Sequence, residues 1–425
     1  MKFGMPGSRG GAWQKFQAAF GTHIGKPPII ARPSLNKSSV TRIKETSDFG
    51  TNPGNLRMFT YVPGSVDSFL SDSPALVVVL HGCGQTAAGY DHGAGWSSLA
   101  DRYGFALLMP QQQPSNNQNT CFNWFLPEDT QRGRGEAASI KQMIDTMTRE
   151  TGVDPSRVFI TGLSAGGAMT SVMLACYPDV FAAGAIVAGL PFGSASNLQQ
   201  ALQSMYQSPP RFPREWGDAV RAAGPRVDVT WPRVSVWHGA ADKTVIPSNA
   251  REIIKQWTDV HGLPQSPTNQ MTVDGHPRHV WLNERGEEAI ELYNVAGMGH
   301  GTPLATGGAD TECGHAGPFL LDVGISSTFH IATFFGLTAE EASPRTVIDV
   351  QETVEETIAD APLAAGTIVA PEIMPPQMTA PQFRAPRIVE QEIEDREGPA
   401  QSRMPNRIDI GAVITKALTA AGLMK

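Results

Sequence analysis

Ser164 lies in the run GLSAG at positions 162–166, which fits the pattern G-x-S-x-G. A β-branched run at 157–161 leads into it, and a small, apolar run at 167–176 follows. This strand–turn–helix setting places a serine on a sharp turn, where crowding requires small neighbours such as Gly162, Ala165 and Gly166. The pattern predicts that Ser164 is a nucleophile. The alternative is an ordinary glycine-rich turn with a serine that faces solvent.

A nucleophilic serine needs a base that accepts its proton and a carboxylate that orients the base. Asp242 comes shortly after the apolar run at 233–237, past the carboxyl end of a predicted strand. Active-site loops gather at that end of a parallel sheet. We therefore expect Asp242 to be the orienting carboxylate. The alternative is a turn aspartate that caps a helix beginning near 248.

His300 lies in the glycine-rich run GMGHG at 297–301, just after a predicted strand that ends at 295. Such a loop can bring an imidazole to Ser164, so we expect His300 to be the general base. His315 is a competitor, because it also lies in a glycine-containing loop, although farther from a strand. His330 falls on a predicted helix, where packing or solvation is the more ordinary role.

The run LHGCGQ at 80–85 follows the most apolar predicted strand, 76–80. This is the place of a loop whose backbone binds the negatively charged oxygen of a tetrahedral intermediate. The predicted oxyanion donors are the backbone N–H groups of Cys83 and Ala165, each typically worth about 10²–10³ in rate. The alternative is a plain tight turn.

Strand-like and helix-like runs alternate along the middle of the chain. Strands are predicted at 57–62, 76–80, 105–109, 157–161, 182–187, 233–237 and 290–295. Helices are predicted at 135–150, 167–176, 248–259 and 326–335, with room for a crossover helix at 86–103. This alternation predicts the α/β class, with a mostly parallel, doubly wound sheet and helices on both faces. The order serine, aspartate, histidine is that of the α/β-hydrolase fold.

Composition divides the chain into further segments. We expect residues 1–50 to be a flexible N-terminal arm with a short helix and 51–337 to be the catalytic domain. Prolines and aromatic residues at 191–230 predict a cap or loop insertion. Residues 338–406 are acidic and proline-rich, which predicts a disordered linker. Residues 407–425 predict an amphipathic helix that docks on a granule or a partner protein.

Several function classes are disfavoured by the composition. The formal net charge is −8 and no basic block occurs, which argues against nucleic-acid binding. No apolar run approaches the roughly 18–20 residues of a transmembrane helix. The four cysteines are scattered and lack zinc-site spacing. We expect no metal and no cofactor, because the serine, histidine and aspartate need none.

The ordered motifs resemble those of the polyhydroxybutyrate depolymerase family of esterases, which is related to family 1 carbohydrate esterases. The resemblance rests on LHGCGQ at 80–85, CFNWF at 121–125, GLSAGG at 162–167, HGAAD at 238–242, GMGHG at 297–301 and LDVGISS at 321–327. It implies hydrolysis of 3-hydroxyalkanoate esters in oligomers or polymer. The alternatives are feruloyl or acetyl esters of plant polysaccharide and, in another class, a binding protein on a hydrolase scaffold.

The resemblance also implies a disulfide between Cys83 and Cys121, whose alternative is two free thiols in a reducing compartment. It places Trp124 and Gln85 near the substrate, although a tryptophan is equally at home in a core. Its secreted members suggest an extracellular location. The N-terminus has no continuous apolar core of the kind found in a signal peptide, which fits a cytoplasmic or granule-associated protein instead.

Overall fold

The computed structural model describes residues 42–64, 73–208, 210–225, 229–309 and 311–338. The short helix predicted in the N-terminal arm lies outside the described residues. So do all but the first residue of the predicted acidic linker and the whole of the predicted amphipathic helix at 407–425.

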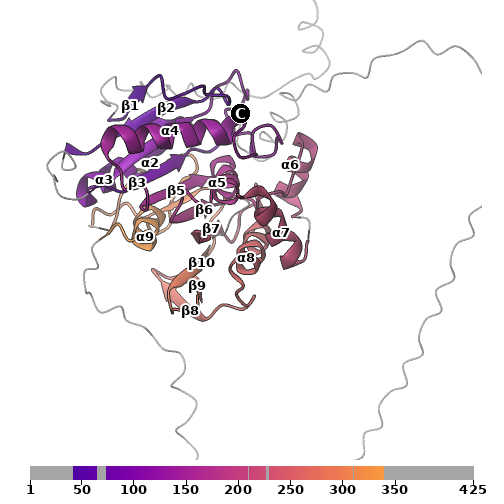
Figure 1. The fold of residues 1–425 in the computed structure, drawn as a ribbon. Coiled ribbons are helices and arrows are strands. Elements are labelled where there is room, and N and C mark those ends of the chain that lie inside the picture. The colour runs from indigo at the N-terminus through magenta and orange to yellow at the C-terminus, as the bar shows by residue number, and fades with distance from the viewer. Residues whose placement is uncertain (1–41, 65–72, 209, 226–228, 310, 339–425) are drawn as a thin grey trace, which may run out of the picture. The chain divides into compact units, whose positions relative to one another are not determined.

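A sheet of 10 strands runs through the described part of the chain in the order β1-β2-β4-β3-β5-β6-β7-β10-β9-β8 (Figure 1). The strands are β1 (Lys44–Thr46), β2 (Arg57–Tyr61), β3 (Leu76–Leu80), β4 (Ala106–Gln111), β5 (Val158–Leu163), β6 (Ala183–Val187), β7 (Arg233–Gly239), β8 (Asn269–Val273), β9 (His276–Leu282) and β10 (Glu288–Val295). The strands from β4 to β10 in this order are parallel, whereas β1, β2, β9 and β8 pair antiparallel at the two edges. The predicted mostly parallel sheet is confirmed.

Helices cover both faces of the sheet, as predicted. They are α2 (Ala87–Ala94), α3 (Trp96–Tyr103), α4 (Gly135–Thr151), α5 (Ala165–Cys176), α6 (Leu198–Tyr206), α7 (Pro213–Ala223), α8 (Ser248–His261) and α9 (Ser327–Phe334). A second, two-stranded sheet joins β11 (Thr302–Leu304) to β12 (Leu320–Asp322). Within the described ranges, no helix has the length and apolar character needed to cross a membrane.

The central strand β3 explains why both faces must be covered. All five of its residues are buried. Leu76, Val78 and Leu80 belong to a core with side chains of α4, α5 and α8, whereas Val77 and Val79 belong to a second core with α2, α3 and α9. Successive side chains of a strand point to opposite faces, so an apolar run without alternation buries both.

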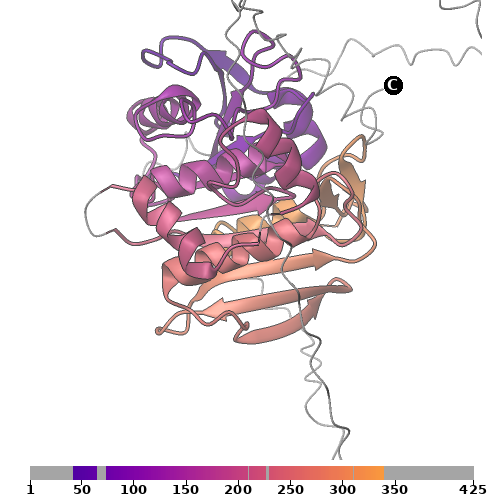
Figure 2. The ribbon, with the colours of Figure 1, turned by 90° about the vertical axis from the view of Figure 1, so that its right-hand side faces the viewer.

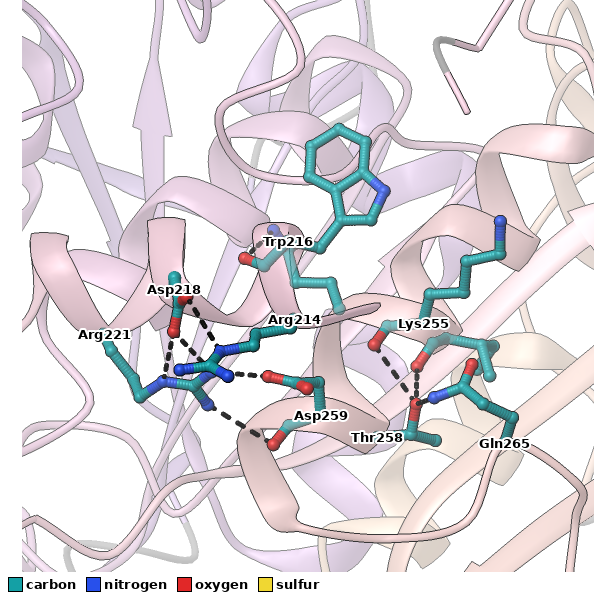
Figure 3. Close-up of polar contacts among 10 residues, drawn as sticks. Arg214, Trp216, Asp218, Arg221, Lys255, Thr258, Asp259 and Gln265 are labelled. Atoms are coloured by element: carbon teal, nitrogen blue, oxygen red, sulfur yellow. Dashed lines mark hydrogen bonds and ion pairs between the residues drawn. The ribbon is translucent and has the colours of Figure 1, made fainter. Parts of the chain in front are cut away.

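The stretch 191–230, predicted as a cap or loop insertion, contains α6 and α7. α7 contacts α5 and α8 and contributes the buried Val220 to the core, so it is part of the crossover from β6 to β7. Arg221 of α7 lies between Asp218 of its own helix and Asp259 of α8 (Figure 3). Trp216 of α7 donates to Glu252 of α8 at 2.7 Å. The prolines that suggested a loop include Pro213, which occupies the first turn of α7, where proline is tolerated.

Three edge strands were not predicted. β1 lies within the predicted arm, and its pairing with β2 places residues 44–46 in the sheet. β8 and β9 form a hairpin next to β10, seen as the orange strands at one edge of Figure 2. Asp274 and Gly275 connect them with φ angles of 48° and 81°. Positive φ at both central residues is the backbone that an Asp-Gly pair favours in a two-residue hairpin loop.

A buried ion pair holds this edge to the body of the sheet. Arg278 of β9 donates from Nε to Glu291 of β10 at 2.7 Å, and Ser235 of β7 donates to the same carboxylate at 2.6 Å. Trp237 in turn donates to Ser235 at 2.8 Å. Glu291 is 1% exposed, and burial raises its pKa even though Arg278 lies beside it. The buried, ionised carboxylate of Glu291 is therefore stable only while Arg278 is paired with it.

We expect Glu291→Ala to destabilise the protein by about 3–5 kcal/mol, because the buried Arg278 then loses its buried partner and, among the described residues, keeps only the more exposed Glu288. The measurement is urea unfolding followed by circular dichroism. The matched control is Glu45→Ala, which breaks the exposed pair between Glu45 and Arg57 and should cost less than about 1 kcal/mol. Equal losses in the two variants would contradict the role of burial.

Candidate active site

Ser164 lies on the turn between β5 and α5 with φ 56° and ψ −115°. Such a backbone is strained for a residue other than glycine, at a cost of order 1–3 kcal/mol, and persists only where the surroundings enforce it. The Ser164 N–H donates to the carbonyl of Val187 in β6 at 2.9 Å, and the Ser164 carbonyl accepts from Ala168 at 2.8 Å. The strained turn is thus fixed from both sides.

Two glycines allow α5 to approach β3 and β5 this closely. A Cβ on Gly162 would lie 2.5 Å from the backbone C and O of Gly166. A Cβ on Gly166 would lie 2.4 Å from the carbonyl oxygen of Leu80 and 2.6 Å from that of His81. Because these neighbours are backbone atoms, they cannot move aside without separating the helix from the sheet.

His300 stands between Ser164 and Asp242. Its Nε2 lies 2.9 Å from Ser164 Oγ, and its Nδ1 lies 2.7 Å from Asp242 Oδ2. With Nδ1–H donating to the carboxylate, Nε2 is left as an acceptor for the Ser164 hydroxyl. The structure therefore brings together the three residues that the sequence singled out, from loops after β5, β7 and β10.

Asp242 is 3% exposed and is held by hydrogen bonds on both oxygens. Oδ1 accepts from the N–H of Thr244 at 2.8 Å and of Val245 at 3.0 Å. Oδ2 faces His300 and also lies 3.4 Å from Nε2 of His238. Burial alone would raise the pKa of Asp242, but hydrogen bonds from His238 and His300 outweigh it and hold that pKa below its usual value. Asp242 is therefore an anion at neutral pH.

The competing histidines lie elsewhere. His315 stacks on His92 with ring centroids 4.0 Å apart, and its Nδ1 lies 3.1 Å from the His92 carbonyl. His330 of α9 pairs with Asp274 of the β8–β9 hairpin at 2.8 Å. Neither makes a hydrogen bond with Ser164 among the described residues.

The loop after β3 lies against the serine turn. A Cβ on Gly82 would lie 3.4 Å from the side chain of Leu163, next to Ser164. Among the described residues, neither the N–H of Cys83 nor that of Ala165 donates to a protein acceptor. Ala165 is the first residue of α5, and the first N–H groups of a helix have no partner within it. Neither N–H group is thus used by a hydrogen bond within the described part of the fold.

Gln85, predicted to lie near the substrate, bonds within this loop. Its Oε1 accepts from the N–H of Gly82 at 2.8 Å. The Cys83 sulfur is joined to Cys121 by a disulfide, which connects the loop to residues 121–125. Trp124 is buried in the core shared by α4 and α5, with its ring edge-to-face with Phe125 at 5.4 Å.

Sequence reasoning gave no role to His238 or Phe319. His238 is buried in β7, and its Nε2 donates to the carbonyl of Val245 at 2.7 Å, next to Asp242. Phe319 has φ 62°, and its ring lies edge-on to His300 with centroids 6.1 Å apart. Its carbonyl accepts from Thr302 at 2.8 Å, which fixes the chain just after His300. The run HGAAD contains a signal for His238, but nothing in the sequence indicates Phe319.

The described residues contain no group of three or more His, Cys, Asp or Glu side chains placed to hold a metal ion. The groups that the structure brings together are a hydroxyl, an imidazole and a carboxylate. That set suits acyl transfer.

Comparisons with known proteins agree with this chemistry. The fold and the relatives define the chain as a serine esterase, a carboxylic ester hydrolase with an α/β-hydrolase fold. Within that class it belongs to the family described as esterase PHB depolymerase, whose family profile matches residues 59–273.

Two relatives and one solved structure illustrate the range of the family. Poly(3-hydroxyalkanoate) depolymerase C of Paucimonas lemoignei is 46% identical over 319 residues, which cover 74% of this chain and 76% of the relative. An acetylxylan esterase of Coprinopsis cinerea is 37% identical over 277 residues, which cover 64% and 71%. The structure of an acetyl xylan esterase from Aspergillus awamori is similar with a TM-score of 0.58 and 25% identity, over 70% of this chain and 99% of that one.

We expect Gly162→Ala to lower both the melting temperature and ester hydrolysis, because its methyl group meets backbone atoms of Gly166. Overpacking of this kind costs roughly 1–3 kcal/mol or more. The matched control is Gly317→Ala, whose Cβ would meet nothing within 4 Å. Thermal melting and hydrolysis of a p-nitrophenyl ester measure both effects. An unchanged Gly162→Ala enzyme would show that the turn is not under this constraint.

Proposed function

We propose that Ser164, His300 and Asp242 are a catalytic triad that hydrolyses carboxylic esters through an acyl-enzyme. The observation that carries this proposal is the continuous hydrogen-bonded chain from Ser164 Oγ through His300 to Asp242, with distances of 2.9 and 2.7 Å. Those distances and the tautomer that they require are what base-assisted attack by a serine needs.

In the first half of the reaction, Ser164 Oγ bonds to the ester carbonyl carbon while its proton moves to His300 Nε2. The N–H groups of Cys83 and Ala165 bind the resulting oxyanion. The carbon–oxygen bond to the leaving group then breaks, and the alkoxide takes the proton from Nε2. In the second half, water attacks the acyl-enzyme, gives its proton to Nε2 and releases the acid, while Ser164 recovers its proton. Asp242 stays ionised and stabilises the imidazolium.

The proposed substrates are 3-hydroxyalkanoate esters, as oligomers or polymer. The support is the 46% identity to a relative that is named a poly(3-hydroxyalkanoate) depolymerase, over about three quarters of both chains. In such a substrate both the acyl group and the leaving alkoxide are short hydroxyacyl units.

A second candidate function is the hydrolysis of feruloyl or acetyl esters on polysaccharide. It is favoured by the similarity to a solved acetyl xylan esterase, which the match covers over 99% of its length. A feruloyl esterase B of Neurospora crassa is also 35% identical over 269 residues. The triad chemistry is the same, and only the groups flanking the ester differ.

The two candidates are separated by a substrate panel. kcat/KM is measured on 3-hydroxybutyrate oligomers, feruloylated oligosaccharides and acetylated xylo-oligosaccharides. We expect the hydroxybutyrate oligomers to be preferred. Preference for either sugar ester would favour the second candidate.

Docking of residues 407–425 on a granule or partner stays a separate proposal, because those residues lie outside the described part of the chain. Truncation after Leu337 tests it. Hydrolysis of soluble esters should survive truncation, while binding to polymer granules should be lost.

We expect Ser164→Ala to lower kcat on p-nitrophenyl butyrate by roughly 10⁴-fold or more without unfolding. Asp242→Asn should lower kcat by about 10⁴-fold, because it favours the wrong tautomer of His300. The control is Ser196→Ala, which removes an exposed hydroxyl bonded only to Gln200 among the described residues. Substantial residual activity in Ser164→Ala would rule out this nucleophile.

A further inference from the structure

A buried carboxylate that the triad does not use lies at the start of α4. Glu136 is 1% exposed. Its Oε1 accepts from Nε2 of Gln112 at 2.5 Å, and its Oε2 accepts from the backbone N–H of Asn123 at 2.9 Å. Within the described residues it forms no ion pair with Lys, Arg or His. This differs from Glu291, which has Arg278 beside it.

One branch of contacts leads from Glu136 to the predicted oxyanion loop. The backbone N–H of Gln112 donates to Nε2 of His81 at 3.1 Å, so the proton of the neutral ring is on Nδ1. That Nδ1 lies 2.7 Å from the carbonyl of Gly82 and donates to it. Burial lowers the pKa of His81 to about 4, so this arrangement persists at neutral pH. Gly82 directly precedes Cys83, one of the proposed oxyanion donors.

A second branch reaches the same place through the disulfide. Glu136 holds the N–H of Asn123, and Gln112 Nε2 also donates to the carbonyl of Cys121 at 3.1 Å. Cys121 is bonded to Cys83. The two branches therefore form a closed ring of hydrogen bonds and covalent bonds, in which Glu136 joins residues 121–123 to residues 81–83.

We propose that Glu136 is a positioning residue for the oxyanion loop, and that its ionisation loosens this loop and lowers esterase activity at alkaline pH. The inference rests on the proposed function, because it concerns the loop to which the oxyanion role is assigned.

The charges around Glu136 give the direction of the effect. The pKa of Glu136 is raised to about 8: burial contributes most, the negative charge of Asp129 adds to it, and hydrogen bonds from Asn123 and Gln112 act in the opposite direction. The position of Glu136 in the first turn of α4 also favours the ionised carboxylate, because the N-terminal end of a helix carries partial positive charge. This effect is smaller than the opposing effect of burial. The titratable groups around Glu136 are Asp129, from the loop before α4, and His81, which directly follows β3 and is reached through Gln112, just after β4. His81 stays neutral as Glu136 titrates.

Ionisation puts a negative charge in a buried place that already faces Asp129 and that, in the described ranges, has no cation to balance it. Such a charge is relieved by admitting water or by moving apart. Because both oxygens of Glu136 hold donors of the ring, any such movement is passed to residues 81–83. A shift of a few tenths of an ångström in an oxyanion donor is enough to weaken transition-state binding.

The first test is the pH dependence of kcat on a soluble p-nitrophenyl ester, with Ser164→Ala as the blank for spontaneous hydrolysis. We expect the wild-type kcat to fall above about pH 8. Glu136→Gln cannot ionise and should lack that decline. Its kcat at pH 7 should fall by no more than about tenfold, the effect of one lost hydrogen bond, because the amide NH2 of glutamine cannot accept from Gln112 or Asn123. Superimposable alkaline limbs for the two enzymes would overturn the proposal.

Two neighbouring variants sharpen the test. Asp129→Asn keeps the oxygen that accepts from the Glu136 N–H but removes the charge that raises the Glu136 pKa. The alkaline decline should therefore begin at lower pH. Glu128→Gln makes the same chemical change as Glu136→Gln on an exposed side chain and should leave the profile unchanged. If the alkaline decline of kcat begins at the same pH in Asp129→Asn as in the wild type, the decline belongs to another group.

A second readout does not depend on activity. Between pH 4.5, the ordinary pKa of a glutamate side chain, and about pH 8, Glu136 is protonated when folded and ionised when unfolded. Its contribution to stability is therefore fully present below about pH 4.5 and is lost as pH rises through about 8. Over that window the unfolding equilibrium constant of the wild type should rise relative to Glu136→Gln by up to about tenfold per pH unit.

The two readouts separate the ways in which the idea can fail. If the wild type hydrolyses no ester, the proposed function fails, while the stability comparison still reports on Glu136. If the pH dependence of unfolding changes in Glu136→Gln but the decline of kcat at high pH does not, Glu136 is a buried acid without a positioning role.

Discussion

The close approach of α5 to the ends of β3 and β5 is the constraint on which the site depends. It exists only because positions 162 and 166 carry no Cβ, and it fixes Ser164 in a backbone that a serine does not adopt freely. The loop after β3 lies directly against this turn. The carbonyl of Val187 in β6 accepts a hydrogen bond from the backbone N–H of Ser164. β7 and β10, next along the sheet, supply the loops with Asp242 and His300. Five neighbouring parallel strands, β3, β5, β6, β7 and β10, thus contribute to the surroundings of one hydroxyl.

Much of this arrangement could be predicted because it depends on local patterns. Continuous apolar runs such as 76–80 indicated strands buried on both faces. Glycine-rich runs indicated the loops that carry Ser164 and His300, and its place after a strand indicated Asp242. The two helices in 191–230 were missed because proline suggested a loop, although Pro213 begins a helix. The Asp-Gly pair at 274–275 did contain a signal for the β8–β9 hairpin.

What the sequence could not give is the direction of side chains and contacts between distant segments. Nothing in the sequence indicated that the side-chain oxygen of Gln85 bonds to the backbone of its own loop. Phe319 reaches His300 only because β11 and β12 pair. Glu136 looks like an ordinary acidic residue in the first turn of a helix. Its significance comes from Gln112 and Asn123, which the folded chain places on it.

The order of the three central residues along the chain has a consequence for synthesis. His300 follows Ser164 by 136 residues, and Asp242 lies between them. When the serine turn leaves the ribosome, the histidine proposed as its base has not yet been made, so no imidazole is in place to accept the hydroxyl proton. On the proposed mechanism, the nascent polypeptide therefore becomes reactive towards esters only when β10 and the loop after it have joined the sheet, so that completion of the fold and onset of reactivity are the same event.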